Sequence, residues 1–189
     1  MADLDEEDGS IDVEPYFWIP GENIRVRMDR DRVPYETWID QGLVNATEGN
    51  IIHYGAIQRK LEELRESYDI CEIAFDRWGA TKLSTDLADA GFTMVLFGQG
   101  YASRSAPTKE LLNVVISKQI RHGGNPVLRW MADSMDVKQD PTGNIKPVQP
   151  DRGKSGKRID GIVALIMAID RLIRNENVRS VYAKSPVYI

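Results

Sequence analysis

Asp76 is the first residue whose type and position could do chemistry. It directly follows the apolar run Ile70–Phe75, which predicts a buried strand, and it precedes a turn and a helix. In open α/β sheets, functional side chains gather at the carboxyl ends of strands, so Asp76 is a candidate catalytic and metal-binding residue. Capping of the next turn, or an ion pair with Arg77, explains an acid at this position equally well.

Asp160 is the second candidate, at the start of the most apolar helix that the sequence predicts. An acid in a first helical turn ordinarily offsets the helix dipole. Here Lys157 and Arg158 precede it, so a carboxylate and two cations lie close together. Phosphodiester hydrolysis needs carboxylates that hold divalent metal, with cations nearby for phosphate. Because hard oxygen ligands favour Mg²⁺ or Mn²⁺ over zinc, we expect one of these ions as the cofactor of Asp76 and Asp160.

A basic segment runs from Lys146 to Arg158, with five basic residues and one acid, although the net charge of the chain is −5. A local basic segment on an acidic protein can contact phosphates. Such contacts position a duplex without reading its bases. A solvated polar loop is the alternative. The residues expected to contact DNA are Lys146, Lys154, Lys157 and Arg158.

Other chemistries find less support. His122, in RHGGNPVLRW, is an accessory candidate for metal or phosphate, although a structural hydrogen-bonding role is commoner for such a histidine. One cysteine and two histidines exclude a zinc site and a disulfide framework. The segment Gly153-Lys154-Ser155 looks like the end of a phosphate-binding loop, but that motif needs a glycine where this chain has Val148. The chain is therefore not an ATPase by itself.

The composition is that of one ordinary domain: 189 residues, 42% hydrophobic and 28% charged. No apolar run approaches the roughly 20 residues that span a bilayer. The first 14 residues carry seven acids and no base, unlike a signal peptide. These features predict a cytosolic protein without a membrane partner.

The hydrophobic pattern predicts strands and helices in alternation. Asp5–Gly9 is typical of a hairpin tip and Ser10–Ile19 of a strand, and the tip needs a strand before it. Met1–Leu4 are too few for one, so we expect the chain to start one strand late. Gly98–Pro107 is predicted to be a loop. The other predicted elements are strands at Leu43–Thr47, Ile70–Phe75 and Thr93–Phe97, a hairpin of Met135–Gln139 with Asn144–Val148, and helices within 22–41, at His53–Tyr68, Thr81–Ala90 and Thr108–Gln119, from Pro126, and at Ile159–Ile173.

This order predicts an α/β fold, with a mixed sheet flanked by helices as in ribonuclease H-like proteins and without the first strand. Residues 1–175 would form this N-terminally incomplete domain, and residues 176–189 a polar C-terminal tail with little order.

Several long blocks together resemble the C-terminal nuclease domain of phage terminase large subunits. They follow one another in the family's order along most of the chain. The blocks are PYFWIP (15–20), DRDRVPYETWIDQGLVNATEGNIIHY (29–54), EIAFDRWGA (72–80), QGYASRSAPTKEL (99–111), RHGGNPVLRWMA (121–132), DPTGNIKP (140–147) and KRIDGIVALIMAIDR (157–171).

The resemblance implies a ribonuclease H-like domain that cleaves concatemeric double-stranded DNA with two metal ions when packaging starts and ends. The family uses three acids; Asp76 matches the second and Asp160 the third. The first belongs to an upstream strand without a counterpart here, where Asp3 and Asp5 are the nearest acids. The implied partners are DNA, an ATPase domain, a small terminase subunit and a portal. The implied location is the cytoplasm of the infected or lysogenic host, outside the mature virion.

Two further readings stay open. A catalytically incomplete fragment would bind DNA or packaging partners through the basic segment, and it would not need Asp76 and Asp160 for more than folding. A small-molecule enzyme is disfavoured because no glycine-rich nucleotide loop follows a strand. A deep apolar pocket would revive that reading.

Overall fold

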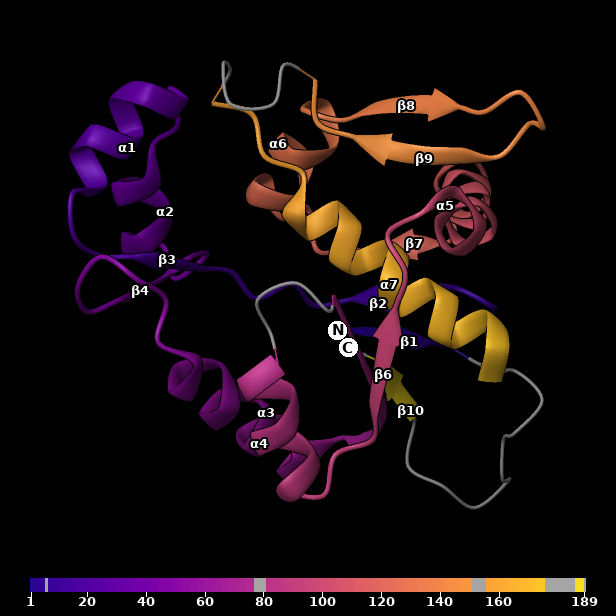
Figure 1. The fold of residues 1–189 in the computed structure, drawn as a ribbon, viewed down its shortest axis with the longest axis horizontal. Coiled ribbons are helices and arrows are strands. Elements are labelled where there is room, and N and C mark those ends of the chain that lie inside the picture. The colour runs from indigo at the N-terminus through magenta and orange to yellow at the C-terminus, as the bar shows by residue number, and fades with distance from the viewer. Residues whose placement is uncertain (6, 77–80, 151–155, 176–185, 189) are drawn as a thin grey trace.

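A six-stranded mixed sheet forms the centre of the domain (Figure 1). The computed structural model describes residues 1–5, 7–76, 81–150, 156–175 and 186–188. The strands lie in the order β6-β5-β10-β1-β2-β7, and β1 is antiparallel to both of its neighbours while the other pairs are parallel. The mixed α/β architecture is therefore confirmed. The strands are β1 (Ala2–Leu4), β2 (Ile11–Val13), β5 (Asp69–Asp76), β6 (Met94–Phe97), β7 (Ile120–Arg121) and β10 (Pro186–Tyr188).

Helices cover both faces of β5. Successive side chains of a strand point to opposite faces, so neighbouring residues of β5 join different cores. Ile73 joins a core with Leu61 and Leu87, from α3 (Tyr54–Ser67) and α4 (Thr81–Asp89). Ala74 joins Met167 on the other face. That face carries α5 (Tyr101–Ile116), α6 (Pro126–Asp133) and α7 (Asp160–Asn175), which share the largest core with β1 and β2.

Two smaller units flank the sheet (Figure 1). The first comprises the parallel pair β3 (Trp18–Pro20) and β4 (Asn45–Thr47), with α1 (Ile24–Asp31) and α2 (Tyr35–Asp40) between them in sequence. The Tyr35 ring contacts Trp38 and Trp130 edge-on, and the tilted Trp38–Trp130 pair also joins α2 to α6. The second is the predicted hairpin of β8 (Asp136–Gln139) and β9 (Ile145–Val148), which lies against α5.

The prediction that Met1–Leu4 are too few for a strand is wrong, and so is the expectation that the sheet lacks the strand before the hairpin tip. Ala2–Leu4 form β1, which pairs with β2 through the predicted hairpin tip. The tip closes tightly: the Asp5 amide donates to the Ser10 carbonyl at 2.8 Å, and Gly9 adopts a φ of +71°. A tight turn and neighbours on both sides let three residues form a strand that would not be stable alone.

Three other predicted segments also differ. Ser10–Ile19 divides into β2 and β3 of separate sheets, because Pro15 between them cannot donate to a strand ladder. The predicted loop Gly98–Pro107 is largely the first half of α5, whose buried Pro107 shows that packing outweighs helix propensity. Within the tail, Pro186–Tyr188 form β10 between β5 and β1. Among the described residues, no helix is long and apolar enough to span a bilayer.

Candidate functional site

Helix α7 lies antiparallel along β5. In the middle of β5, Glu72 contacts the last turns of the helix: its carboxylate lies 3.4 Å from the Arg171 guanidinium and accepts a hydrogen bond from Asn175 at 2.9 Å. Two residues further along β5, Ala74 packs with Met167 and Val163, one and two turns nearer the start of α7. Moving toward the end of the strand therefore means moving toward the start of the helix.

This alignment brings Asp76 and Asp160 to the same end of the sheet. From Glu72 to Asp76 the strand advances about 13 Å, at roughly 3.3 Å per residue. From Arg171 back to Asp160 the helix covers about 16 Å, at 1.5 Å per residue. Phe75, the neighbour of Asp76, lines the same hollow as Asp160, which agrees with this alignment. Two acids that are 84 positions apart in the chain thus share one region.

An ionic network at the other end of α7 holds this alignment. The Asp170 side chain is 6% exposed and contacts Arg171 at 2.7 Å and Arg174 at 3.0 Å. Arg171 also reaches Glu72 on β5, so one buried guanidinium ties the helix to the strand. Bonds in a partly buried network constrain geometry more than isolated surface pairs do.

Close packing positions the first turn of α7. Ile159 is buried, whereas Asp160 is exposed. A Cβ atom on Gly161 would lie 2.7 Å from the Phe17 ring and 2.8 Å from the Met131 sulfur, so only glycine fits there without displacing them. The sequence Ile159-Asp160-Gly161 therefore places a carboxylate at the surface directly beside a tightly packed backbone.

Asp31, which no sequence pattern indicates, lines the same hollow as Asp160. Its carboxylate accepts hydrogen bonds from the Arg30 guanidinium at 2.6 and 2.8 Å and from the Tyr35 hydroxyl at 3.0 Å. Arg158 lies 3.7 Å away. Burial alone would raise the pKa of Asp31, but these hydrogen bonds and the two guanidinium charges outweigh it and lower that pKa. A carboxylate with such partners stays ionised.

Asp31, Arg30, Arg158 and Asp160 all line one hollow of about 560 Å³. The rest of its lining is mainly apolar and includes Phe75. Asp160 lines this hollow and Asp76 does not, so the hollow does not enclose both acids. An apolar hollow of this size is also what a small-molecule enzyme would use.

Asp76 also has a cation in its neighbourhood, Arg104 of α5. Burial lowers the pKa of Arg104, and the negative charge of Asp76 raises it again in part. The guanidinium donates to the Pro147 carbonyl of β9 at 3.5 Å. On the same strand, the Lys146 ammonium lies 4.4 Å from the centre of the Tyr101 ring. The sequence pattern predicts a loop at Gly98–Pro107 and therefore does not indicate Arg104.

The other predicted residues are more scattered. His122 lines a separate hollow with Tyr16 and Asn125, and that hollow includes neither candidate acid. Lys157 is exposed, and its carbonyl accepts a hydrogen bond from Gln149 at 2.6 Å. Lys154 lies outside the described residues.

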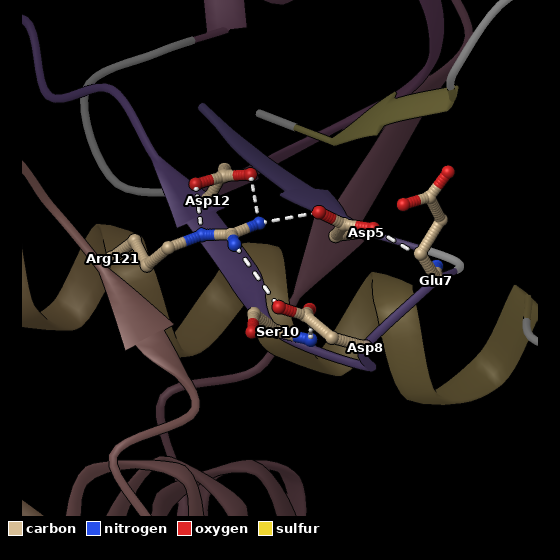
Figure 2. Close-up of polar contacts among 6 residues, drawn as sticks. All are labelled: Asp5, Glu7, Asp8, Ser10, Asp12 and Arg121. Carbon is tan, nitrogen blue, oxygen red and sulfur yellow. Dashed lines mark hydrogen bonds and ion pairs between the residues drawn. The ribbon is translucent and has the colours of Figure 1, made fainter.

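Asp5 is held in an ion cluster around Arg121 of β7, as Figure 2 shows. The guanidinium lies 2.6 Å from Asp5, 3.1 Å from Asp8 and 2.8 Å from Asp12. The hydrogen bond from Arg121 lowers the pKa of Asp5. The carboxylate of Asp5 thus binds Arg121 and the backbone of the hairpin tip. Asp3 lies on β1, paired in register with Asp12.

The carboxylates of the candidate site fit a single Mg²⁺ ion better than a pair of ions. Among the residues that the structure describes, no group of three or more His, Cys, Asp or Glu side chains could hold an ion. Two carboxylates at one end of the sheet fit Mg²⁺, which commonly keeps several waters and takes one or two protein carboxylates plus substrate phosphate. They do not supply the bridging acids that two ions 3.5–4 Å apart need.

The model of the terminase large subunit endonuclease domain family matches residues 6–176, which is most of the chain. The chain belongs to this family. Over 165 residues the domain is 33% identical to the large terminase subunit of Enterobacteria phage HK97, covering 86% of this chain and 32% of that protein. Over 168 residues it is 33% identical to protein YmfN of Escherichia coli K12, covering 87% and 37% respectively.

The crystal structure of the HK97 large terminase is similar to this terminase nuclease domain, with a TM-score of 0.80 and 32% identity over 90% of this chain and 35% of that one. The domain thus spans about a third of the length of these relatives. The match places the chain in a nuclease family, in spite of the apolar hollow.

Proposed function

We propose that this terminase nuclease domain is a metal-dependent endonuclease that cuts double-stranded DNA, on a ribonuclease H-like sheet. The observation that carries the proposal is the antiparallel packing of α7 on β5, which brings Asp76 and Asp160 to one end of the sheet. Convergent carboxylates with cations nearby are the arrangement that phosphodiester hydrolysis needs.

Asp76 and Asp160 would hold Mg²⁺ or Mn²⁺ through their carboxylate oxygens. When bound, such an ion polarises a phosphoryl oxygen and makes a bound water more acidic. Arg104 near Asp76 and Arg158 near Asp160 would each bind a phosphate oxygen, so that the scissile phosphate lies between the two acids. A second ion would need further ligands from DNA, water or another segment.

The basic side chains around the acids would hold the duplex. Lys146 on β9 and Lys157 before α7 flank the two ends of the segment 149–156. With Lys154 and Arg158 they would contact phosphates and leave the bases unread, which gives cleavage with little sequence preference. His122 would have at most an accessory role, in its separate hollow.

In a complete terminase, this domain would act with an ATPase domain, a small subunit and a portal, on concatemeric DNA at the start and end of packaging. One relative is the large terminase subunit of a phage, which supports this setting. The site of action would be the cytoplasm of the bacterial host and not the mature virion.

Plasmid nicking tests the proposal. Supercoiled plasmid is incubated with the chain and Mn²⁺ or Mg²⁺, with EDTA as the metal-free arm. We expect EDTA-sensitive nicking that falls roughly a hundredfold or more in Asp76→Asn and Asp160→Asn, because each removes a charged metal ligand. Asp89→Asn, an exposed acid at the end of α4, is the matched control and should retain full activity.

A binding module without catalysis is the second candidate function, favoured by the small number of carboxylates that converge among the described residues. Under that alternative, the folded wild-type chain binds duplex DNA but does not nick it with either ion. The double variant Asp76→Asn, Asp160→Asn would then bind DNA as well or more tightly, because two negative charges are gone. Nicking by the wild type that both single variants lose would exclude this alternative.

A further inference from the structure

Asp31 is among the most deeply buried charged groups that the structure describes, and the mechanism above does not use it. Its side chain is 2% exposed, yet it faces two guanidinium groups and a hydroxyl. An ionised carboxylate is costly to bury unless partners satisfy it. Here the partners come from three places in the chain: Arg30 beside it, Tyr35 in the next helix and Arg158 at the entry to α7.

The backbone makes a second contact at the same point. A Cβ atom on Gly156 would overlap the Cα atom of Asp31 and would lie 2.6 Å from its carbonyl oxygen. Only a glycine lets the chain pass this close to the end of α1. The segment 156–158 is therefore docked on Asp31 twice, by the backbone of Gly156 and by the side chain of Arg158.

The charge balance of the contact leaves a surplus of positive charge. One carboxylate serves two guanidinium groups, which are 54% (Arg30) and 33% (Arg158) exposed. Both arginines line the hollow that Asp160 lines. Each guanidinium has five N–H donors, so donors remain free to bind an oxyanion after the carboxylate is satisfied.

We propose that Asp31 is a positioning residue that fixes Arg158 and Arg30 as a paired clamp for a DNA backbone phosphate beside Asp160. This inference rests on the proposed nuclease function and deepens it. Arg158 is two residues before Asp160, so the same contact also fixes where the first turn of α7 begins. A free arginine side chain would lose rotamer entropy on binding phosphate, whereas a held one has already lost it.

The sign of the effect of Asp31→Asn on DNA affinity tests the clamp. On charge alone, removing an acid near DNA strengthens binding. If Asp31 positions the arginines, Asp31→Asn instead weakens binding about five- to tenfold near 0.1 M salt and lowers the salt slope by about one, the contribution of one phosphate contact. Asp29→Asn, an exposed acid on the same helix, makes the same charge change and should leave affinity equal or slightly higher.

The measurement is fluorescence anisotropy of a labelled duplex in EDTA at several salt concentrations, which needs no cleavage. A double-mutant cycle with Arg158→Gln adds a readout that a purely structural role would not produce. In the Arg158→Gln background, Asp31→Asn should lose most of its effect, because the group that it positions is absent.

A variant that changes no charge covers the case in which Asp31→Asn does not fold. Gly156→Ala should displace the segment from Asp31 and weaken binding to a similar degree. Gly55→Ala, at a glycine with open space around it, is its control.

The outcomes separate the two proposals. A wild-type chain that binds no duplex at any salt concentration overturns both the nuclease function and the clamp. A wild type that binds, with Asp31→Asn indistinguishable from Asp29→Asn and Gly156→Ala from Gly55→Ala, overturns the clamp alone.

Discussion

In this domain, single polar side chains accept hydrogen bonds from backbone amides that have no backbone acceptor, at a helix start and in a hairpin turn. Asn125 is an example at the start of α6: its side-chain oxygen accepts hydrogen bonds from the amides of Val127 and Leu128, both at 3.0 Å. Pro126 at the first helical position lacks an amide that would need a partner. This cap follows directly from the sequence Gly-Asn-Pro.

We expect Asn125→Ala to reduce the free energy of unfolding by about 1 kcal/mol, because two amides lose their acceptor. Asn125→Ser keeps an oxygen acceptor and should lie within a few tenths of a kcal/mol of the wild type. Urea unfolding followed by circular dichroism measures both. Equal losses in the two variants would contradict the capping role.

Asp140 makes the turn of the β8–β9 hairpin sensitive to acid. Hydrogen bonds from the side chain of Asn144, and from Thr142, lower the pKa of Asp140 from 3.8 to about 2. The folded pKa lies below the ordinary value, so the carboxylate contributes its full stabilisation above about pH 4. That contribution is lost as the pH falls through 2. NMR amide shifts of Thr142 and Asn144 should follow this titration, and Asp140→Ala should show the loosened turn at neutral pH. Shifts that titrate near 4 would contradict the prediction.

At the scale of elements, the pairing of α7 with β5 determines whether the candidate site exists. Arg171 is the side chain that joins them, 11% exposed and bound to both Glu72 and Asp170. We expect Arg171→Ala to cost about 2 kcal/mol of unfolding free energy, because Glu72 and Asp170 lose a shared guanidinium and keep only Asn175 and Arg174 as partners. Arg174→Ala removes an i,i+4 pair whose arginine is 61% exposed, and should cost less than about 1 kcal/mol.

The same two variants test whether the register of α7 on β5 affects the candidate site. If the register of α7 positions Asp160, Arg171→Ala lowers metal-dependent nicking at temperatures where the protein is still folded, and Arg174→Ala does not. Thermal unfolding and plasmid nicking on the same samples measure this. Full nicking activity in a folded Arg171→Ala variant would show that the register does not depend on this arginine.

At the scale of the whole molecule, β10 joins two halves of the sheet. It is parallel to β5 on one side and antiparallel to β1 on the other. Removing residues 176–189 would leave two strand edges open in the middle of the sheet. Open edges lose their hydrogen bonds, each worth about 1 kcal/mol net, and they invite pairing with other chains.

We therefore expect the chain truncated after Asn175 to unfold at a lower temperature and to form concentration-dependent oligomers. Differential scanning fluorimetry and light scattering measure the two effects. Val187→Pro tests the same strand within the full chain, since proline cannot donate to a ladder. A truncated chain that is as stable and as monomeric as the full chain would show that β10 contributes nothing to the sheet.

The sequence alone determined the elements with strong local patterns. The apolar run Ile70–Phe75, the periodic segment His53–Tyr68 and the apolar helix before Asn175 lie where they were predicted, within a few residues. Their hydrophobic periodicity is local information, because burial of one face needs no knowledge of the partner. The family blocks are equally local, and the match to the terminase nuclease family confirms them.

Tertiary structure decided which distant residues meet. Nothing in the sequence around Asp31 shows that Arg158 lies 3.7 Å from its carboxylate, or that Gly156 packs on its backbone. Three elements depend on tertiary neighbours: the short strands β1 and β10 and the first half of α5. Contacts with these neighbours offset the loss of conformational entropy on ordering, so local propensity did not predict the three elements. For the same reason, the sequence identified Asp76 and Asp160 one at a time, and only the antiparallel packing of α7 on β5 brings them to the same end of the sheet.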